Sequence, residues 1–333
     1  MSASMTAFPG KSRLSILLEP FSTIEDPRDV RRIMHPLAEV LLLIVCGTVA
    51  DCDDISAWGE AHLDFLQRHV PYTHGVPGGR WLTILMNRID PVLFQAAFTG
   101  WVRDPWPERP DFVAIDGKTS RRSHDRATGE PPLRLVSAFA TTSRLVRGQE
   151  AVADKSNELT AIPVLLARLA EGDRLRGALV SSNAIATNGT IATAIRQVGA
   201  DYLLAAKANQ PRLRADIEAC FYEAPVGSVD RFTEHDKGHG RIERREIAVI
   251  REVDWLSRDR RFPGELRLPD ATSIVRVRAP IQWGATTHTE TRYHISSAIL
   301  GAERAGQAIR GHWGIENRLH WVLDVTFNGK RRV

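Results

Sequence analysis

The chain has 333 residues, of which 43% are hydrophobic and 25% charged, and its formal net charge is +4 at pH 7. This composition is that of an ordinary globular protein long enough for two domains, and it excludes a disordered or fibrous chain. The mild positive charge permits a polyanionic partner such as nucleic acid but does not require one.

Cysteine usage and hydropathy indicate the compartment. The three cysteines, Cys46, Cys52 and Cys220, contain no C-x-x-C pair, which argues against a disulfide framework and against a zinc ribbon. The most apolar run, residues 37–50, contains Glu39 and is shorter than the roughly 20 residues of a membrane span. The N-terminus shows no signal-peptide pattern. We therefore expect a cytoplasmic protein.

The first part of the chain predicts a small helical domain at residues 1–104. Apolar residues recur at helical spacing, and the segment 104–110, with three prolines, cannot continue a helix. We place the domain boundary there. The expected helices are residues 36–50, 55–68, 81–89 and 91–102.

The second part, residues 111–333, predicts a mixed sheet with helices packed against it, an α/β fold. Helical and strand periodicities alternate along it. The expected strands are residues 112–116, 133–141, 145–151, 178–182 and 202–206, followed by β-like runs at 246–250, 273–277 and 292–297. The expected helices are residues 159–169, 190–198 and 302–322.

Two acids in remote parts of this domain indicate a metal site. Asp116 ends a short apolar run and precedes Gly117, and Glu316 lies among aromatic, imidazole and guanidinium groups on the last helix. Carboxylates from a strand end and a late helix are what a divalent-metal site for phosphoryl transfer requires. Taken alone, Asp116 is more often a turn-forming acid.

Two other interpretations of these segments are excluded, the first by the sequence motif and the second by helix geometry. Residues 116–119 are not the end of a phosphate-binding loop, because that motif needs glycine where Phe112 stands. His312, Glu316 and His320 share one helix face, but eight residues place the two imidazoles roughly 12 Å apart along the axis. Ligand distances of about 2 Å make a single shared zinc ion untenable.

Six motifs in a fixed order carry a family resemblance. They are Asp116 in Ala-Ile-Asp-Gly-Lys, Lys155-Ser-Asn-Glu-Leu-Thr-Ala-Ile-Pro163, Lys207-Ala-Asn-Gln210, Lys237-Gly-His-Gly-Arg241, Arg292-Tyr-His-Ile-Ser-Ser297 and Trp313-Gly-Ile-Glu-Asn317. Their order resembles that of DDE-type insertion-sequence transposases of the group that includes the H-repeat-associated proteins. The resemblance spans about residues 21–327.

The resemblance implies a ribonuclease H-like catalytic core with a β-rich insertion at about residues 228–299, preceded by the helical associated domain. It also implies Mg²⁺- or Mn²⁺-dependent strand cleavage and transfer. The implied partners are double-stranded DNA at the transposon ends and target DNA, bound by a possible homodimer. The implied location is the cytoplasm, in association with the nucleoid.

Carried over residue by residue, Asp116 matches the first catalytic and metal-binding acid, and Glu316 matches the third. At the second position this chain has Asn183, preceded by Ser182 instead of an apolar residue. An asparagine carbonyl can ligate a cation but brings no charge. The family also continues with acidic residues beyond Phe327, where this sequence ends in Gly-Lys-Arg-Arg-Val. Two hypotheses stay open: an active transposase, and a degenerate DNA-binding remnant without chemistry.

Basic and polar residues of the same motifs are the expected DNA contacts. Two segments have a second interpretation: residues 207–211 also fit a capped helix start without a ligand, and residues 237–245 also fit a solvated hairpin. The resemblance favours DNA. The expected contacts are Lys118, Lys207, Asn209, Gln210, Lys237, His239, Arg241, His312 and Asn317.

Overall fold

The computed structural model divides the chain into two compact units, residues Met1–Glu108 and Arg109–Val333. No helix in the described ranges has the length and apolar character needed to cross a membrane. The structure describes residues 18–49, 54–103, 111–120, 132–152, 158–171, 175–183, 186–206, 210–238, 241–258, 265–283 and 286–320.

The first unit is helical, as its periodicity predicts. The expected helix over residues 55–68 is interrupted at His62 and forms two shorter helices. Asp54 starts the first of these, because its side chain accepts a hydrogen bond from the Ala57 N–H. The helices are η1 (Val30–Arg32), α2 (Leu37–Val49), α3 (Ile55–Ala61), α4 (Leu63–Leu66), α5 (Gly79–Met86) and α6 (Pro91–Arg103).

Glu39, the acid inside the most apolar run, is buried in the core of this unit. Its carboxylate accepts a hydrogen bond from the Tyr72 N–H at 2.7 Å, and the Tyr72 hydroxyl donates to the Glu39 carbonyl at 2.6 Å. These bonds offset the cost of burying both polar groups. Glu39 therefore fixes the Tyr72 segment to α2.

The second unit contains one nine-stranded sheet within the described residues, in the order β3-β2-β1-β4-β5-β9-β8-β7-β6. The strands are β1 (Phe112–Thr119), β2 (Arg134–Ala140), β3 (Leu145–Val152), β4 (Leu179–Ser182), β5 (Asp201–Ala206), β6 (Asp230–Gly238), β7 (Arg241–Ile250), β8 (Ser273–Trp283) and β9 (Thr286–Ser296). The helices are α7 (Glu158–Ala170), α8 (Gly189–Gln197), α9 (Pro211–Glu223), η3 (Asp254–Leu256), α10 (Ala302–Gly314) and the π-helix η4 (Ile315–His320).

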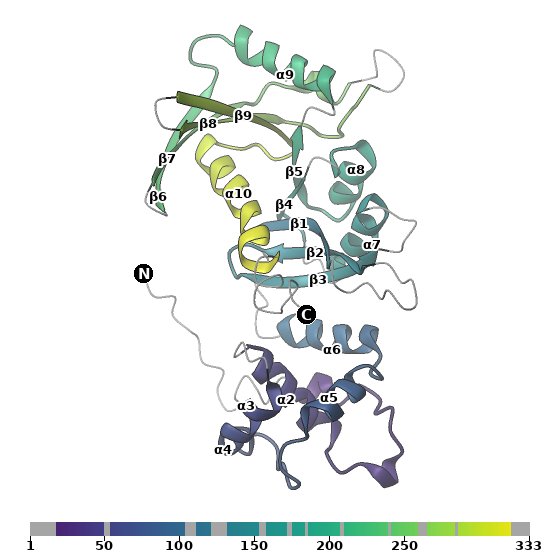
Figure 1. The fold of residues 1–333 in the computed structure, drawn as a ribbon. Helices are drawn as coiled ribbons and strands as arrows, with labels where there is room; N and C mark the ends of the chain where they lie inside the picture. The colour runs from purple at the N-terminus through teal and green to yellow at the C-terminus, as the bar shows by residue number, and fades with distance from the viewer. Residues whose placement is uncertain are drawn as a thin grey trace. The chain divides into compact units, whose positions relative to one another are not determined.

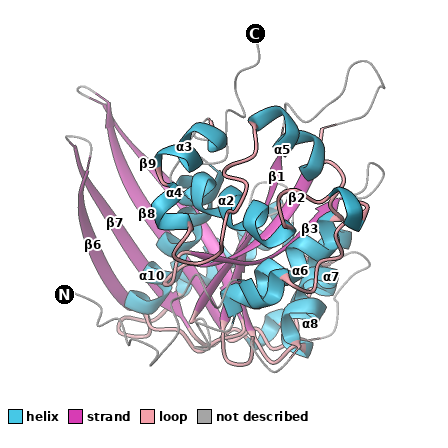
Figure 2. Cartoon of the chain, turned by 90° about the horizontal axis from the view of Figure 1, so that it is seen from below, coloured by secondary structure: helices cyan, strands magenta, loops and turns pink. Residues whose placement is uncertain are grey.

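The first five strands confirm the predicted ribonuclease H-like core. β1, β2 and β3 form an antiparallel meander, whereas β4 and β5 continue the sheet from β1 in parallel. The β-rich segment extends the same sheet, because β9 pairs antiparallel with β5 and then with β8. Figure 2 shows β6 to β9 at one end of the sheet, away from α7 and α8.

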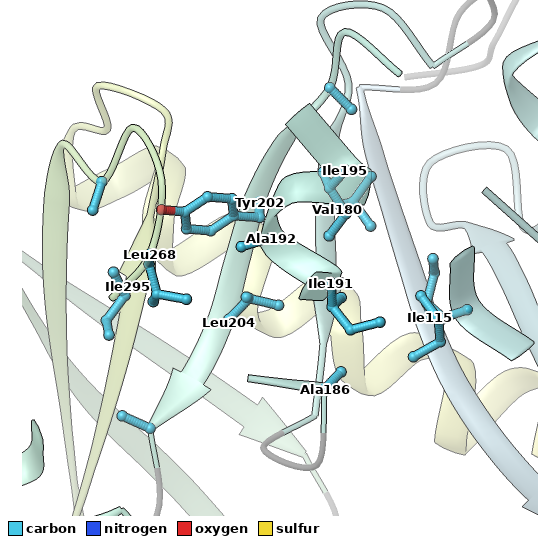
Figure 3. Close-up of a cluster of buried hydrophobic side chains, with 14 of the residues drawn as sticks. Ile115, Val180, Ala186, Ile191, Ala192, Ile195, Tyr202, Leu204, Leu268 and Ile295 are labelled. Carbon is cyan, nitrogen blue, oxygen red and sulfur yellow. The ribbon is translucent and has the colours of Figure 1, made fainter. Parts of the chain in front are cut away.

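Helices cover both faces of this sheet (Figure 1). Side chains of α7, α8 and α9 share one buried cluster with β1, β4 and β5, and those of α10 pack on the opposite face. In Figure 3, Ile191 and Ile195 of α8 lie over Val180 of β4, with Ile115 of β1 beside them. Along β1, odd-numbered residues therefore face α7, and the even-numbered Ala114 faces η4.

Two elements near the predicted site differ from expectation. β1 does not end at Asp116, because Gly117, Lys118 and Thr119 continue to pair with β2. The last helix changes from α to π geometry at Ile315, and a π-helix inside an α-helix often marks a functional position.

Candidate active site

Asp116 and Asn183 lie side by side where the parallel pairing of β1 and β4 ends. The last paired residues of the two strands are Ile115 and Ser182. Asp116 and Asn183 are the residues that directly follow this pair along the chain. The Asn183 amide donates a hydrogen bond to Asp116 Oδ1 at 2.9 Å, although 67 positions separate the residues in the sequence. The parallel strands thus bring together two of the three predicted catalytic positions.

Two serines of β4 fix this edge of the sheet. The Ser182 hydroxyl donates to the Ile115 carbonyl at 3.1 Å, which ties β4 to β1 beside Asp116. Ser181, the neighbour of Ser182, faces the other side of the sheet. Its hydroxyl lies 3.0 Å from Nδ1 of His312 and so connects β4 to α10. His312, predicted as a DNA contact, is therefore half-buried against the sheet.

The π-helix η4 places a histidine against Asp116, the first of the predicted catalytic acids. His320 is buried, and its Nδ1 lies 3.5 Å from Asp116 Oδ2. Ile315 anchors the start of η4 in a small cluster with Ala114 and Phe139. Sequence reasoning considered His320 only as a zinc ligand and missed this contact.

Glu316, the predicted third acid, lies on η4 between these two anchors. Its side chain is exposed, as is that of the adjacent Asn317. The element that carries Glu316 thus reaches β1 through Ile315 and His320. Convergence of the Glu316 carboxylate with Asp116 and Asn183 stays a prediction.

A further acid, Glu158, belongs to this group, and sequence reasoning gave it no role. It is the first residue of α7, and its carboxyl group lies against Gly117, where any side-chain carbon would overlap it. Burial raises the pKa of Glu158, and the Asp116 charge raises it further, whereas a hydrogen bond with Asn183 lowers it. The Asn183 amide therefore contacts both carboxyl groups.

The donor set fits a divalent cation. Asp116 and Glu158 offer carboxylate oxygens, and Asn183 offers a carbonyl oxygen, which are the ligand types that Mg²⁺ and Mn²⁺ prefer. Gly117 leaves the space through which Glu158 reaches the site. Within the described ranges, no three His, Cys, Asp or Glu side chains are gathered as a metal cluster, and the amide of Asn183 occupies the position between the two acids.

The predicted DNA contacts are only partly within the described structure. Gln210 precedes Pro211 at the start of α9, and its amide donates to the Thr187 carbonyl at 2.7 Å. Lys118 is half-buried on β1. The remaining residues of this set lie outside the described residues, either entirely or by their side chains: Lys207, Asn209, His239, Lys237 and Arg241.

The described end of the basic run is partly neutralised within its own hairpin. Arg244 pairs with Glu246 at 2.7 Å, and Arg245 lies 3.8 Å from Glu234. Such pairs are typical of a solvated surface. A DNA contact by this hairpin stays a prediction.

Comparison with known proteins identifies the family. Residues 18–102 match the DDE_Tnp_1-associated family, and residues 107–332 match the Transposase DDE domain family. The H repeat-associated putative transposase YhhI of Escherichia coli (strain K12) is 35% identical over 95% of this chain and 84% of its own length. The H repeat-associated putative transposase YbfD of the same strain is 34% identical over 73% of this chain and 97% of its own length.

A solved structure of a piggyBac transposase synaptic complex with hairpin DNA aligns with 94% of this chain and 68% of that chain. Its TM-score is 0.42 at 9% identity, so this distant likeness adds nothing to the assignment. The family matches span both units, and the relatives align over most of the chain. The chain belongs to the family of DDE-domain transposases.

Proposed function

We propose that this protein cleaves and joins DNA strands at the ends of a mobile element, using a divalent cation held at Asp116, Asn183 and Glu316. The observation that carries the proposal is the contact between Asp116 and Asn183 at 2.9 Å, at the end of two parallel strands. By the motif match, Asp116 and Asn183 stand at the positions of the first two metal-binding residues of a DDE domain. The cation is Mg²⁺ or Mn²⁺.

The side chains around Asp116 fix its orientation. Asn183 donates to one of its carboxylate oxygens, and His320 lies beside the other. Both partners restrict rotation of the carboxylate, which is the preorganisation that an active site needs. The Ser181 hydroxyl holds His312 and so positions the helix that leads to Glu316.

A bound divalent cation supplies a Lewis acid that activates water or a 3′-hydroxyl and neutralises charge at the attacked phosphodiester. The protein contributes the negative charge and the geometry that hold it. Asp116 and Glu316 are the acids of this set by the motif match, and Asn183 contributes a neutral carbonyl. The polar and basic motif residues, with Lys118 and Gln210 among the described ones, orient the DNA backbone.

The second candidate function is a DNA-binding remnant with little or no chemistry. It is favoured by one observation: the Asn183 amide directs a hydrogen-bond donor, not a charge, at Asp116. Removing one preorganised electrostatic group from an active site costs on the order of 10²–10³ in rate. Such a protein would still bind double-stranded DNA, as a monomer or homodimer in the cytoplasm.

A nicking assay on a supercoiled plasmid that carries the element ends distinguishes the active transposase from the DNA-binding remnant. We compare the parent with Asp116→Asn, and use Glu171→Gln, an exposed acid just beyond α7, as the control. Nicking that requires Mg²⁺ or Mn²⁺, is lost in Asp116→Asn and is kept in Glu171→Gln supports the enzyme.

Binding to the same DNA is measured over a range of salt concentrations alongside the nicking. Salt-sensitive binding without nicking supports the remnant, because phosphate contacts release counterions. A parent that neither nicks nor binds DNA contradicts both candidates.

A further inference from the structure

We propose that Glu158 is a metal ligand of this site, so that Asp116 and Glu158 together hold the divalent cation beside Asn183. This inference rests on the proposed function, because it takes the Asp116 site to be the metal site. It adds a residue that the motif match to the three catalytic positions does not contain.

The first argument is the path by which Glu158 reaches the site. Along β1, Asp116 faces the side of η4, and Gly117 faces the side of α7. Glu158 begins α7 and extends its carboxyl group over Gly117, where any larger residue would overlap it. The absence of a side chain at position 117 is therefore what lets an acid from the α7 side reach Asp116.

The second argument is the partner that the two acids share. Asn183 hydrogen-bonds Asp116 at 2.9 Å and also hydrogen-bonds Glu158. Its amide N–H groups give both carboxylates a positive partner, as a cation between them would. With Asn183 neutral, Glu158 adds a carboxylate to those of Asp116 and Glu316 and so supplies the negative charge that Asn183 does not bring to a divalent cation.

The third argument is the closeness of the two acids. Each contacts the single side-chain amide of Asn183, so their carboxyl groups lie near each other. Two nearby carboxylates repel each other unless a proton or a cation lies between them. An acid at a helix start can stabilise the helix dipole, but that role needs neither Asp116 nor a glycine opposite.

Mn²⁺ binding to the full-length protein without DNA tests the inference without any activity measurement. Free Mn²⁺ is followed by electron paramagnetic resonance for the parent, Asp116→Asn, Glu158→Gln and the control Glu171→Gln. We expect Asp116→Asn and Glu158→Gln each to raise the Kd on the order of 10–100-fold, the loss seen even for outer partners of metal sites. Glu171→Gln should bind as the parent does.

The outcomes separate the two proposals. If Asp116→Asn weakens binding and Glu158→Gln does not, Glu158 is not a ligand and the proposed function stands. If neither variant changes Mn²⁺ binding, the metal site at Asp116 is wrong, and this inference fails with it. A purely structural Glu158 would lower the melting temperature equally with and without Mn²⁺, whereas a ligand reduces the Mn²⁺-induced rise.

A second variant keeps the inference testable if Glu158→Gln does not fold. Glu158→Asp keeps the charge but shortens the side chain by one methylene group, so the carboxylate no longer reaches as far over Gly117. We expect it to fold and to bind Mn²⁺ more weakly than the parent. Mn²⁺ affinity equal to that of the parent would overturn the proposal.

Discussion

Replacing Asn183 with aspartate tests the electrostatics of the site. Asn183→Asp removes the N–H groups that contact Asp116 and Glu158 and puts a third carboxylate in their place. Losing a hydrogen bond to a charged group costs about 1.5–3 kcal/mol. Like charges about 4 Å apart repel by roughly 4 kcal/mol at an effective dielectric constant of 20, although proton uptake by the acids limits this cost.

We take about 3 kcal/mol as the net loss without metal, which lowers the melting temperature of a domain of this size by roughly 6–12 °C. Mg²⁺ should reverse this loss, because the additional carboxylate makes the site bind a divalent cation more tightly. The assay is thermal unfolding of the metal-free protein, with chelator and then with Mg²⁺. The control is Asn188→Asp: Asn188 caps α8 by accepting from the Ile191 N–H, and aspartate caps equally well.

Equal melting temperatures of Asn183→Asp and the parent in chelator would refute this reasoning, since the amide would then not be holding two acids together. A lower melting temperature that Mg²⁺ fails to restore would refute the metal site but not the repulsion.

Three further predictions concern other positions. Gly117→Ala should lower the free energy of unfolding by about 1–3 kcal/mol, because the new methyl group overlaps the Glu158 carboxyl; an unchanged urea midpoint would contradict it. Hydrogen bonds from Arg28 lower the pKa of Asp26, so its stabilisation is present above the unfolded-state pKa and is lost as pH falls through the lower folded value. Asp26→Asn should therefore flatten the acid side of the stability profile, and an unchanged acid limb would count against it. Burial raises the pKa of Cys46 to about 11, so Cys46 should react with a thiol reagent at pH 8 only as the protein unfolds, and rapid labelling of the native state would show otherwise.

The sheet and the pairing of Asp116 with Asn183 were predictable from the sequence. Apolar runs of strand length locate β1 and β4, and the carboxyl ends of neighbouring parallel strands meet at one edge. The two polar residues that follow these runs must then lie together. The structure places them in hydrogen-bond contact.

The position of Glu158 against Gly117 was not predictable in the same way. An acid in the first turn of a helix is expected for the helix dipole alone, and a glycine after Asp116 is expected for a turn. Only the packing of α7 on β1 shows that the two residues belong together. Their joint occurrence in the matched motifs was the available signal.

The contact of His320 with Asp116 depends on a local change of helix geometry. The periodicity of residues 302–322 predicts one continuous α-helix, and residue spacing does not distinguish α from π hydrogen bonding. The change at Ile315 alters the direction of each side chain beyond it. The exposed position of Glu316 and the buried position of His320 both follow this change.

The central claim is that Asp116, Asn183 and Glu316 form one catalytic metal site. The most direct measurement is the rate of Mg²⁺-dependent plasmid nicking by Asn183→Asp, alone and combined with Glu316→Gln, with Glu303→Gln on the exposed side of α10 as the control. We predict that Asn183→Asp raises the rate on the order of 10²–10³, that Glu316→Gln abolishes the gain and that Glu303→Gln keeps it. A folded, DNA-binding Asn183→Asp protein that nicks no faster than the parent, or a gain that survives Glu316→Gln, would contradict the claim.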